Sequence, residues 1–228
     1  DKSIWYYFSS LDRNFDTKAL NRLGTNIFLL NNNAVAEKVL TNLLAHDPKY
    51  IAGYLSLGLV YEQSKKFDKA IDCYNAAIKI DPKDIKPYLS LATLYKEQLE
   101  YEEAIKVYQQ CLINNPSNHI ILSNLGNLFY LQHKYEDAII SHQRAVKSKP
   151  DSYEVQFNFA NTLLNSGKYT EAIEAYRKTS ELKPNFYRAK VSLGSTLLSM
   201  ANFEEGFKEY NHRIYEDKNF KSVLHKKN

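Results

Sequence analysis

Residues 51–84 read IAGYLSLGLVYEQSKKFDKAIDCYNAAIKIDPKD, and the spacing of this stretch recurs along the 228-residue chain. Five of the six prolines are separated by steps of 34 residues, at Pro48, Pro82, Pro116, Pro150 and Pro184. A fixed period of this length indicates an array of stacked units instead of one globular core. With proline at position 32, repeats 1 to 6 are residues 17–50, 51–84, 85–118, 119–152, 153–186 and 187–220.

Two columns of this register hold small residues. Position 8 is occupied by Gly24, Gly58, Ala92, Gly126, Ala160 and Gly194. Position 20 is occupied by Ala36, Ala70, Ala104, Ala138, Ala172 and Gly206. Small side chains let two helix backbones approach closely, while larger neighbours fill the space around them. The two columns therefore predict a pair of helices in each repeat that pack closely at these positions.

The apolar residues of each repeat have helical spacing. Positions 4, 7, 8 and 11 form one i, i+3, i+4, i+7 stripe, and positions 20, 21, 24, 27 and 28 form a second stripe. Proline at position 32 cannot continue a helix, so it ends the second one. Residues 65–68 and 167–170 are typical of the turn between the two helices. Because one helical hairpin cannot bury both of its faces, the units must stack, and the predicted fold is all-α.

A motif within repeat 2 suggests a family. It consists of Tyr54-x2-Leu57-Gly58-x2-Tyr61, then Ala70-x3-Tyr74, then Pro82. The chain in this respect resembles the tetratricopeptide repeat (TPR) family, whose units follow the pattern W-x2-L-G-x2-Y, A-x3-F and P. The resemblance extends over residues 17–220. It implies a right-handed superhelical α-solenoid of helix-turn-helix repeats, in which the first helices line a concave groove that holds an extended peptide or a partner helix.

The two ends of the array depart from this pattern. Repeat 6 has Arg213 at position 27 and Lys218 in place of the proline, and terminal repeats are often atypical because one face meets solvent. Residues 1–16 contain the aromatic run Ile4-Trp5-Tyr6-Tyr7-Phe8. We expect this segment to be a cap over repeat 1 or the second helix of a truncated repeat, and residues 221–228 to be a C-terminal tail. Because the first residue is Asp1, we also expect the chain to be a trimmed or processed product.

The composition argues against several classes of function. The net charge of +4, from 30 Lys and Arg against 26 Asp and Glu, is too small to indicate nucleic acid or an anionic membrane as a partner. The longest apolar stretch, 50–61, is too short and too mixed to span a bilayer, and no signal-peptide pattern is visible. The sequence contains no phosphate-binding loop, nucleophile motif or zinc-binding motif. We therefore expect a cytoplasmic protein that is not an enzyme and uses no cofactor or metal.

Three side chains that could carry chemistry fall in packing columns. His142 occupies position 24, where repeats 2, 3, 5 and 6 have tyrosine. Cys73 and Cys111 occupy positions 23 and 27, and the latter column otherwise holds alanine in repeats 2 and 4. We interpret His142 as a core histidine with a hydrogen-bond partner, and the cysteines as reduced and buried.

Polar side chains occupy the other side of the first helix. Position 6 is about 200° around the helix from position 4, so positions 6 and 9 lie opposite the apolar stripe. The resemblance implies that this side, with positions 2, 5, 6, 9, 12 and 13, lines the groove. Position 6 reads Arg22, Ser56, Ser90, Asn124, Asn158 and Ser192, and position 9 reads Thr25, Leu59, Thr93, Asn127, Asn161 and Ser195. An asparagine amide has donors and an acceptor, so it can pair with a peptide backbone whatever the side chains are.

The predicted peptide-binding residues share this side of the first helices. They are Arg22, Lys86, Ser90, Thr93, Asn124, Asn127, Tyr130, Asn158, Asn161, Asn165, Arg188 and Ser192. Charged residues on the same side are Lys18, Arg22, Lys86, Lys96 and Arg188, against Glu62, Glu97 and Glu154. This small positive excess favours a neutral or acidic peptide.

The sequence supports three hypotheses about function. The first is a protein–protein interaction scaffold that binds a protein or peptide in the groove. The second is the substrate-recognition arm of a larger enzyme, because Asn124-Leu-Gly-Asn127 resembles the asparagine-ladder repeats of O-linked N-acetylglucosamine transferases. The run 203–213 also resembles the closing repeat of bacterial TPR proteins that continue into an enzymatic domain. The third is a structural array that self-associates through its terminal repeats.

Overall fold

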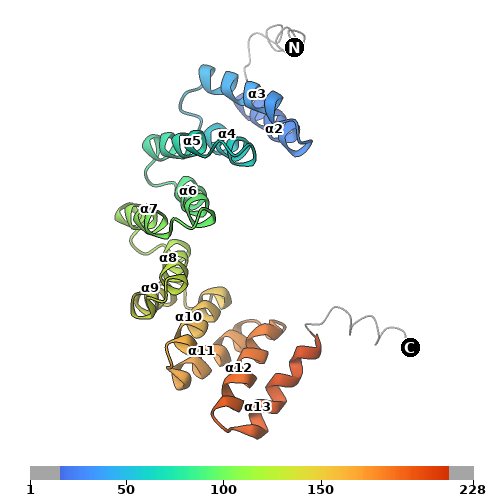
Figure 1. The fold of residues 1–228 in the computed structure, drawn as a ribbon, viewed down its shortest axis with the longest axis vertical. Coiled ribbons are helices and arrows are strands. Elements are labelled where there is room, and N and C mark those ends of the chain that lie inside the picture. The colour runs from blue at the N-terminus through green and yellow to red at the C-terminus, as the bar shows by residue number, and fades with distance from the viewer. Residues whose placement is uncertain (1–15, 216–228) are drawn as a thin grey trace, which may run out of the picture. The chain divides into compact units, whose positions relative to one another are not determined.

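The computed structural model describes residues 16–215 (Figure 1). Within this range the chain forms twelve α-helices, one 3-10 helix and no strand. The predicted N-terminal cap, apart from residue 16, and the predicted tail at 221–228 lie outside the described residues, as does Lys218. The chain divides into two compact units, which are described separately: unit 1 runs up to Val107 and unit 2 begins at Tyr108.

The helices of unit 1 form successive hairpins. They are α2 (Thr17–Leu29), α3 (Asn33–His46), α4 (Ile51–Gln63), α5 (Phe67–Ile80), α6 (Ile85–Glu97) and the first part of α7 (Tyr101–Asn114). The two helices of repeat 1, α2 and α3, pack together, and so do the two helices of repeat 2, α4 and α5. Each second helix also packs on the first helix that follows it, as α3 does on α4 and α5 on α6.

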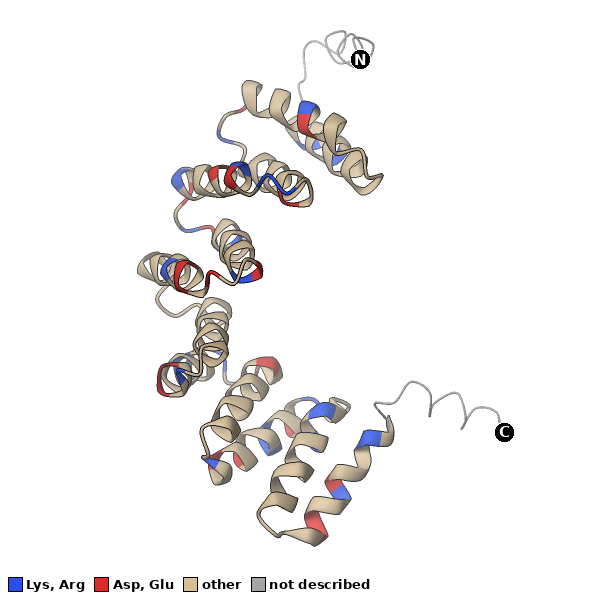
Figure 2. Ribbon diagram, in the orientation of Figure 1, with Lys and Arg blue, Asp and Glu red and all other residues tan. Residues whose placement is uncertain are grey.

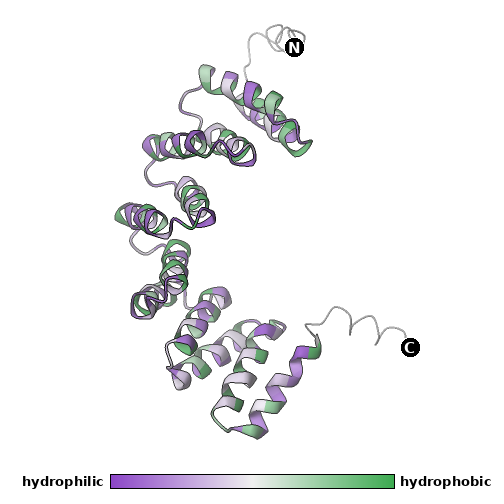
Figure 3. Cartoon of the chain, viewed as in Figure 1, coloured by the Kyte–Doolittle hydropathy of each residue, from purple (hydrophilic) through white to green (hydrophobic). Residues whose placement is uncertain are grey.

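Unit 2 has the same order. After the end of α7 it contains α8 (His119–Leu131), α9 (Tyr135–Ser148), α10 (Tyr153–Asn165), α11 (Tyr169–Leu182), α12 (Tyr187–Ser199), α13 (Phe203–Tyr210) and the 3-10 helix η1 (Asn211–Tyr215). Hairpins α8–α9, α10–α11 and α12–α13 are joined by α9–α10 and α11–α12 contacts. The predicted all-α repeat solenoid is therefore confirmed. In both units, hydrophilic and hydrophobic segments alternate along each helix (Figure 3).

The small residues of positions 8 and 20 lie where helices meet. Five alanines of position 20 have no exposed surface: Ala36, Ala70, Ala104, Ala138 and Ala172. At position 8, a Cβ atom on Gly58 would lie 2.4 Å from the ring of Tyr74, which is at position 24 of the same repeat. The ring therefore occupies the space that a larger residue than glycine would need.

The buried arc of the first helix is wider than the predicted stripe of positions 4, 7, 8 and 11. Position 3 is also buried, in Gly53, Pro87, Ile121, Val155 and Ala189. So is position 10, in Val60, Leu94, Leu128, Thr162 and Thr196. The reason is that a first helix contacts two second helices, its own and the preceding one. A Cβ atom on Gly53, for example, would meet Leu43 and Leu44 of α3 at 2.7 and 2.9 Å.

Each turn between the two helices of a repeat contains one residue in the left-handed region, including the two predicted turns at 65–68 and 167–170. Position 15 has a positive φ throughout, in Asn31, Lys65, Leu99, His133, Gly167 and Ala201. The next amide then donates to the carbonyl five residues back, as from Lys66 to Tyr61 at 2.8 Å. This bond pattern is the Schellman motif, which satisfies the last carbonyls of the first helix.

The second helices end two residues before each proline of position 32. The proline carbonyls then accept hydrogen bonds from position 4 of the next helix: Tyr54 to Pro48 and Tyr88 to Pro82 at 3.2 Å, and Gln156 to Pro150 at 3.3 Å. These bonds fix the angle at which the chain enters the next repeat.

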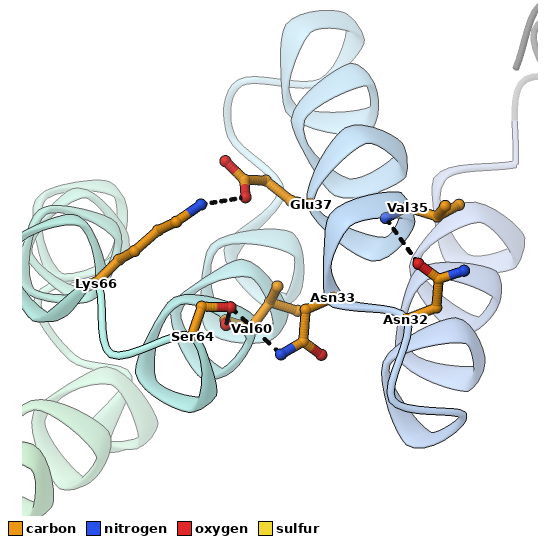
Figure 4. Close-up of polar contacts among 7 residues, drawn as sticks. All are labelled: Asn32, Asn33, Val35, Glu37, Val60, Ser64 and Lys66. Carbon is orange, nitrogen blue, oxygen red and sulfur yellow. Dashed lines mark hydrogen bonds and ion pairs between the residues drawn. The ribbon is translucent and has the colours of Figure 1, made fainter.

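Polar contacts also join repeats 1 and 2 within unit 1 (Figure 4). Asn33 of α3 donates to the Ser64 hydroxyl at 3.3 Å, and Ser64 donates to the Val60 carbonyl at 2.8 Å. Lys66 forms an ion pair with Glu37 at 2.8 Å. Both contacts come from the turn after α4, so they hold that turn against α3.

Candidate functional site

We call the side of the first helices that carries positions 2, 5, 6, 9, 12 and 13 the first-helix face. The twelve predicted binding residues lie on α2, α6, α8, α10 and α12, and none of them is buried. Unit 1 holds Arg22, Lys86, Ser90 and Thr93, and unit 2 holds the other eight. First helices of neighbouring repeats contact each other in both units, as α4 contacts α6 and α8 contacts α10.

Asn158 connects two repeats of unit 2. Its Nδ2 atom donates to the hydroxyl of Ser123 on α8 at 3.3 Å. Ser123 is buried, with 6% of its surface exposed, and Asn158 is half-buried. One end of the Asn158 amide is therefore engaged in holding α10 against α8.

Asn161, one turn further along α10, is held by a residue of the second helix. The hydroxyl of Tyr176 on α11 donates to Asn161 Oδ1 at 2.7 Å. The Tyr176 side chain has no exposed surface. Burial raises the pKa of its hydroxyl well above the usual value, and a hydrogen bond with Ser192 of α12 opposes part of that rise. Tyr176 thus remains protonated and can donate its hydrogen to Asn161.

The amides of repeat 4 are arranged differently. Asn124 and Asn127 on α8 have no hydrogen-bond partner among residues 16–215. His142 stands where repeat 5 has Tyr176, and its ring is fully buried. Its Nδ1 atom lies 3.0 Å from the Thr162 hydroxyl, and a Cβ atom on Gly126 would lie 2.7 Å from its Nε2 atom. The His142 ring therefore contacts the core and makes no hydrogen bond with Asn127.

Two other predicted residues of unit 2 contact residues of their own repeat. Asn165 Nδ2 donates to the backbone carbonyl of Asn161 at 2.8 Å, within α10. Tyr130 makes an edge-on ring contact with Tyr135, with 5.9 Å between the centroids. On α12, Arg188 is exposed and Ser192 is half-buried.

Unit 1 presents a different surface. Within residues 16–107 the structure places no hydrogen bond or ion pair between the side chains of Arg22, Lys86, Ser90 and Thr93. Position 9 of repeat 2 is the exposed Leu59, and Glu62 at position 12 accepts a hydrogen bond from Tyr74 at 2.6 Å. Burial raises the pKa of the Glu62 carboxyl, the Tyr74 bond lowers it in part, and the charge of Glu97 adds to the rise. This surface combines apolar and charged groups instead of amides.

Charged residues of both signs occur on helices of both units (Figure 2). Helix α8 carries none, and α10 carries only Glu154. Among the described residues, no cluster of three His, Cys, Asp or Glu side chains could hold a metal ion. No helix between residues 16 and 215 is long and apolar enough to cross a membrane. Amides and hydroxyls are thus the main polar groups that α8 and α10 present.

Family comparisons agree with the period and the helix pairs. One tetratricopeptide repeat model matches residues 51–84, and a second matches residues 89–153. The chain belongs to the tetratricopeptide repeat family. A model of the anaphase-promoting complex, cyclosome, subunit 3 matches residues 131–212. The resemblance read from the repeat columns is confirmed.

Solved structures share the tetratricopeptide fold of this chain. MamA is 23% identical with a TM-score of 0.63, and the match covers 75% of this chain and 97% of MamA. YrrB, described as a TPR protein with an unusual peptide-binding site, is 21% identical with a TM-score of 0.62 and coverage of 82% and 97%. PilF of Pseudomonas aeruginosa is 18% identical with a TM-score of 0.67 and coverage of 93% and 97%. No curated protein sequence matches the chain.

Sequence reasoning missed two residues that shape the first-helix face of this tetratricopeptide protein. Tyr176 falls in a packing column, and the structure confirms that its ring packs, but its hydroxyl reaches Asn161. Ser123 occupies position 5, next to the predicted Asn124. Position 24 of the second helix packs against position 8 of the first helix, and position 8 directly precedes the polar position 9. A tyrosine at position 24 is therefore close to the residue at position 9. This proximity is the sequence signal that points to Tyr176. The interpretations of His142, Cys73 and Cys111 as buried residues are confirmed.

Proposed function

We propose that this tetratricopeptide chain is a protein-interaction scaffold, and that unit 2 binds an extended peptide on the first-helix face of α8, α10 and α12. One observation carries the proposal. The four amides of Asn124, Asn127, Asn158 and Asn161 lie on adjacent first helices, are not buried, and retain hydrogen-bonding atoms without a protein partner.

These groups suit the backbone of a peptide better than other ligands. An extended backbone alternates N–H donors and C=O acceptors, and a primary amide can satisfy both. Helix α8 carries no charge and α10 carries one carboxylate, so the phosphates of a nucleic acid would find no basic stripe there. YrrB, which shares the fold, is described as having a peptide-binding site, and this analogy supports the class of ligand. We infer that the chain works by binding and not by catalysis.

The test is selection followed by mapping. Random twelve-residue peptides are displayed against the full chain, and the most enriched peptide is synthesised. In a ¹⁵N-labelled chain, its titration should shift the side-chain amide signals of Asn124, Asn127, Asn158 and Asn161. The amide of Gln143, exposed on the second helix α9, is the matched internal control and should not move. Failure to enrich any peptide, or shifts confined to second-helix amides, would contradict the proposal.

The substrate-recognition arm of a glycosyltransferase-like enzyme is a second candidate, since the paired asparagines of α8 and α10 are the feature on which that resemblance rests. It assigns the same face to an acceptor peptide. A coding sequence that continues beyond Asn228 into a transferase domain would favour it over an independent scaffold.

A further inference from the structure

Each asparagine of α10 is held by one end of its amide and open at the other. Asn158 uses its Nδ2 to bind Ser123, and Asn161 uses its Oδ1 to accept from Tyr176. Among residues 16–215, Asn158 Oδ1 and Asn161 Nδ2 have no partner, and neither atom is buried. Repeat 5 therefore presents one acceptor and one donor, on residues that are neighbours on a helix surface because they are three apart.

The orientation of the Asn161 amide follows from its hydrogen bond with Tyr176. A tyrosine hydroxyl has one hydrogen to donate, and an amide oxygen can only accept. In the structure the Tyr176 hydroxyl donates this hydrogen to Asn161 Oδ1 at 2.7 Å. With the oxygen end of Asn161 engaged in this way, the amide presents its N–H groups.

Repeat 4 lacks this device. Asn124 and Asn127 occupy the same two positions on α8, but position 24 is His142, whose Nδ1 contacts Thr162. The Oδ1 and Nδ2 atoms of Asn127 can therefore exchange places by rotation of the side chain. Neighbouring repeats with the same Asn-x-x-Asn spacing thus differ in how firmly their amides are oriented.

We propose that Tyr176 is a positioning residue that gives the first-helix face of repeat 5 a fixed polarity. Asn158 Oδ1 accepts from a peptide N–H, and Asn161 Nδ2 donates to a peptide C=O. This is the pairing by which a strand residue exchanges both bonds with its partner in an antiparallel sheet. The ligand is then an extended segment read through its backbone at repeat 5, while the amides of repeat 4 adapt to it. The inference rests on the proposed peptide-binding function.

The test uses Tyr176→Phe, which keeps the buried ring and removes only the hydroxyl. The matched control is Tyr74→Phe, at the same column of repeat 2, where the hydroxyl binds Glu62 instead of an asparagine. The probe is the synthetic twelve-residue peptide most enriched on the parent chain. Tyr176→Phe should weaken its binding roughly three- to tenfold, and Tyr74→Phe should leave binding unchanged. In an Asn161→Ala background, Tyr176→Phe should have no further effect, because the residue acts only through that amide.

A backbone probe separates positioning from a general structural role. Each peptide bond of the probe is replaced in turn by an ester, which removes one N–H donor. One of these ester peptides should bind the parent chain more weakly than the unmodified peptide does. The same ester peptide and the unmodified peptide should bind Asn158→Ala with equal affinity. An unchanged affinity for Tyr176→Phe, or the same loss in the Asn161→Ala background, would overturn the inference. If the peptide binds and its affinity falls in Asn124→Ala/Asn127→Ala but not in Tyr176→Phe, the inference fails and the proposed function stands. If no peptide is enriched, both fail.

Discussion

The hydroxyl of Thr162 on α10 lies 3.0 Å from Nδ1 of His142 on α9, and both side chains are fully buried at the contact between repeats 4 and 5. The same hydroxyl lies 3.0 Å from the backbone carbonyl of Asn158, one turn earlier on α10. A core histidine therefore contacts the helix that carries three of the candidate binding residues, Asn158, Asn161 and Asn165.

The burial of the His142 ring makes the stability of unit 2 depend on pH. Burial lowers the pKa of His142 to about 4, although the Ser123 carbonyl opposes the effect. An unfolded chain binds the proton near the usual value of 6.5, so stability is full above pH 6.5 and falls as the pH drops toward 4. The loss below pH 4 is about 3 kcal/mol. Urea unfolding between pH 4 and 8 should show it, whereas His142→Tyr, which restores the Tyr–Gly pairing of repeat 2, should flatten the dependence. An equal slope in both proteins would contradict this account.

The turn after α6 offers a simple stabilising change. Leu99 has a φ of 64° and is 71% exposed. Its Cβ atom makes this left-handed backbone unfavourable, and its exposed side chain gains little packing that could offset the cost. Leu99→Gly should raise the free energy of unfolding by about 1 kcal/mol. Leu99→Ala, which keeps a Cβ atom, is the control and should gain nothing. The measurement is the midpoint of thermal unfolding of the parent, Leu99→Gly and Leu99→Ala. A lower midpoint for Leu99→Gly than for the parent would show that the leucine side chain stabilises the protein by packing.

The register can be tested by overpacking. Ala138 on α9 has no exposed surface, so Ala138→Leu should cost about 1–3 kcal/mol. Gln143→Leu, exposed on the same helix, should change stability by less than about 0.5 kcal/mol. Because contacts are mainly between neighbouring repeats, the damage can stay local. Hydrogen exchange should therefore show faster opening of α8 and α9, and unchanged exchange there would mean that the helices are packed differently.

Much of the fold follows from the sequence because the period repeats the same packing problem six times. The proline, glycine and alanine columns place each helix end and each close contact, and Ala36 and Ala172 are as buried as predicted. The burial of positions 3 and 10 is not predicted, because it arises from contact with the second helix of the preceding repeat. An amphipathic stripe read within one helix does not include that contact. The polar character of the first-helix face is predictable from the sequence. The hydrogen bond from Tyr176 to Asn161 is not, because it joins two helices and forms only if the buried tyrosine ring is long enough to bring its hydroxyl to the amide. Such pairings follow from side-chain geometry and not from spacing.

The two cysteines should be unreactive in the folded protein. Burial raises the pKa of the Cys73 thiol to about 12, and Cys111 has no exposed surface. Since the thiolate is the reactive form, an aromatic disulfide reagent should modify both only at the rate of local unfolding. The variants Cys111→Ser and Cys73→Ser each remove one thiol, so they show which cysteine gives rise to each phase of the labelling reaction. Immediate stoichiometric labelling without denaturant would show that the assigned cysteine is not in a packing column.

The central claim is that the four amides of α8 and α10 contact a peptide and contribute little to the stability of the fold. Asn124 and Asn127 have no protein partner among the described residues, so Asn124→Ala/Asn127→Ala should unfold like the parent. Asn158 and Asn161 each make one side-chain bond, so their replacement should cost at most about 1 kcal/mol each. The control, Gln109→Ala/Gln143→Ala, removes exposed amides from second helices of unit 2.

The decisive measurement is therefore calorimetric titration of the enriched twelve-residue peptide into the quadruple variant Asn124→Ala/Asn127→Ala/Asn158→Ala/Asn161→Ala, with circular dichroism confirming that it is folded. Each lost hydrogen bond is worth about 0.5–1.5 kcal/mol, so the account predicts that affinity falls at least about thirtyfold. The glutamine control should bind like the parent. Unchanged affinity in a folded quadruple variant would contradict the claim that these amides bind the peptide.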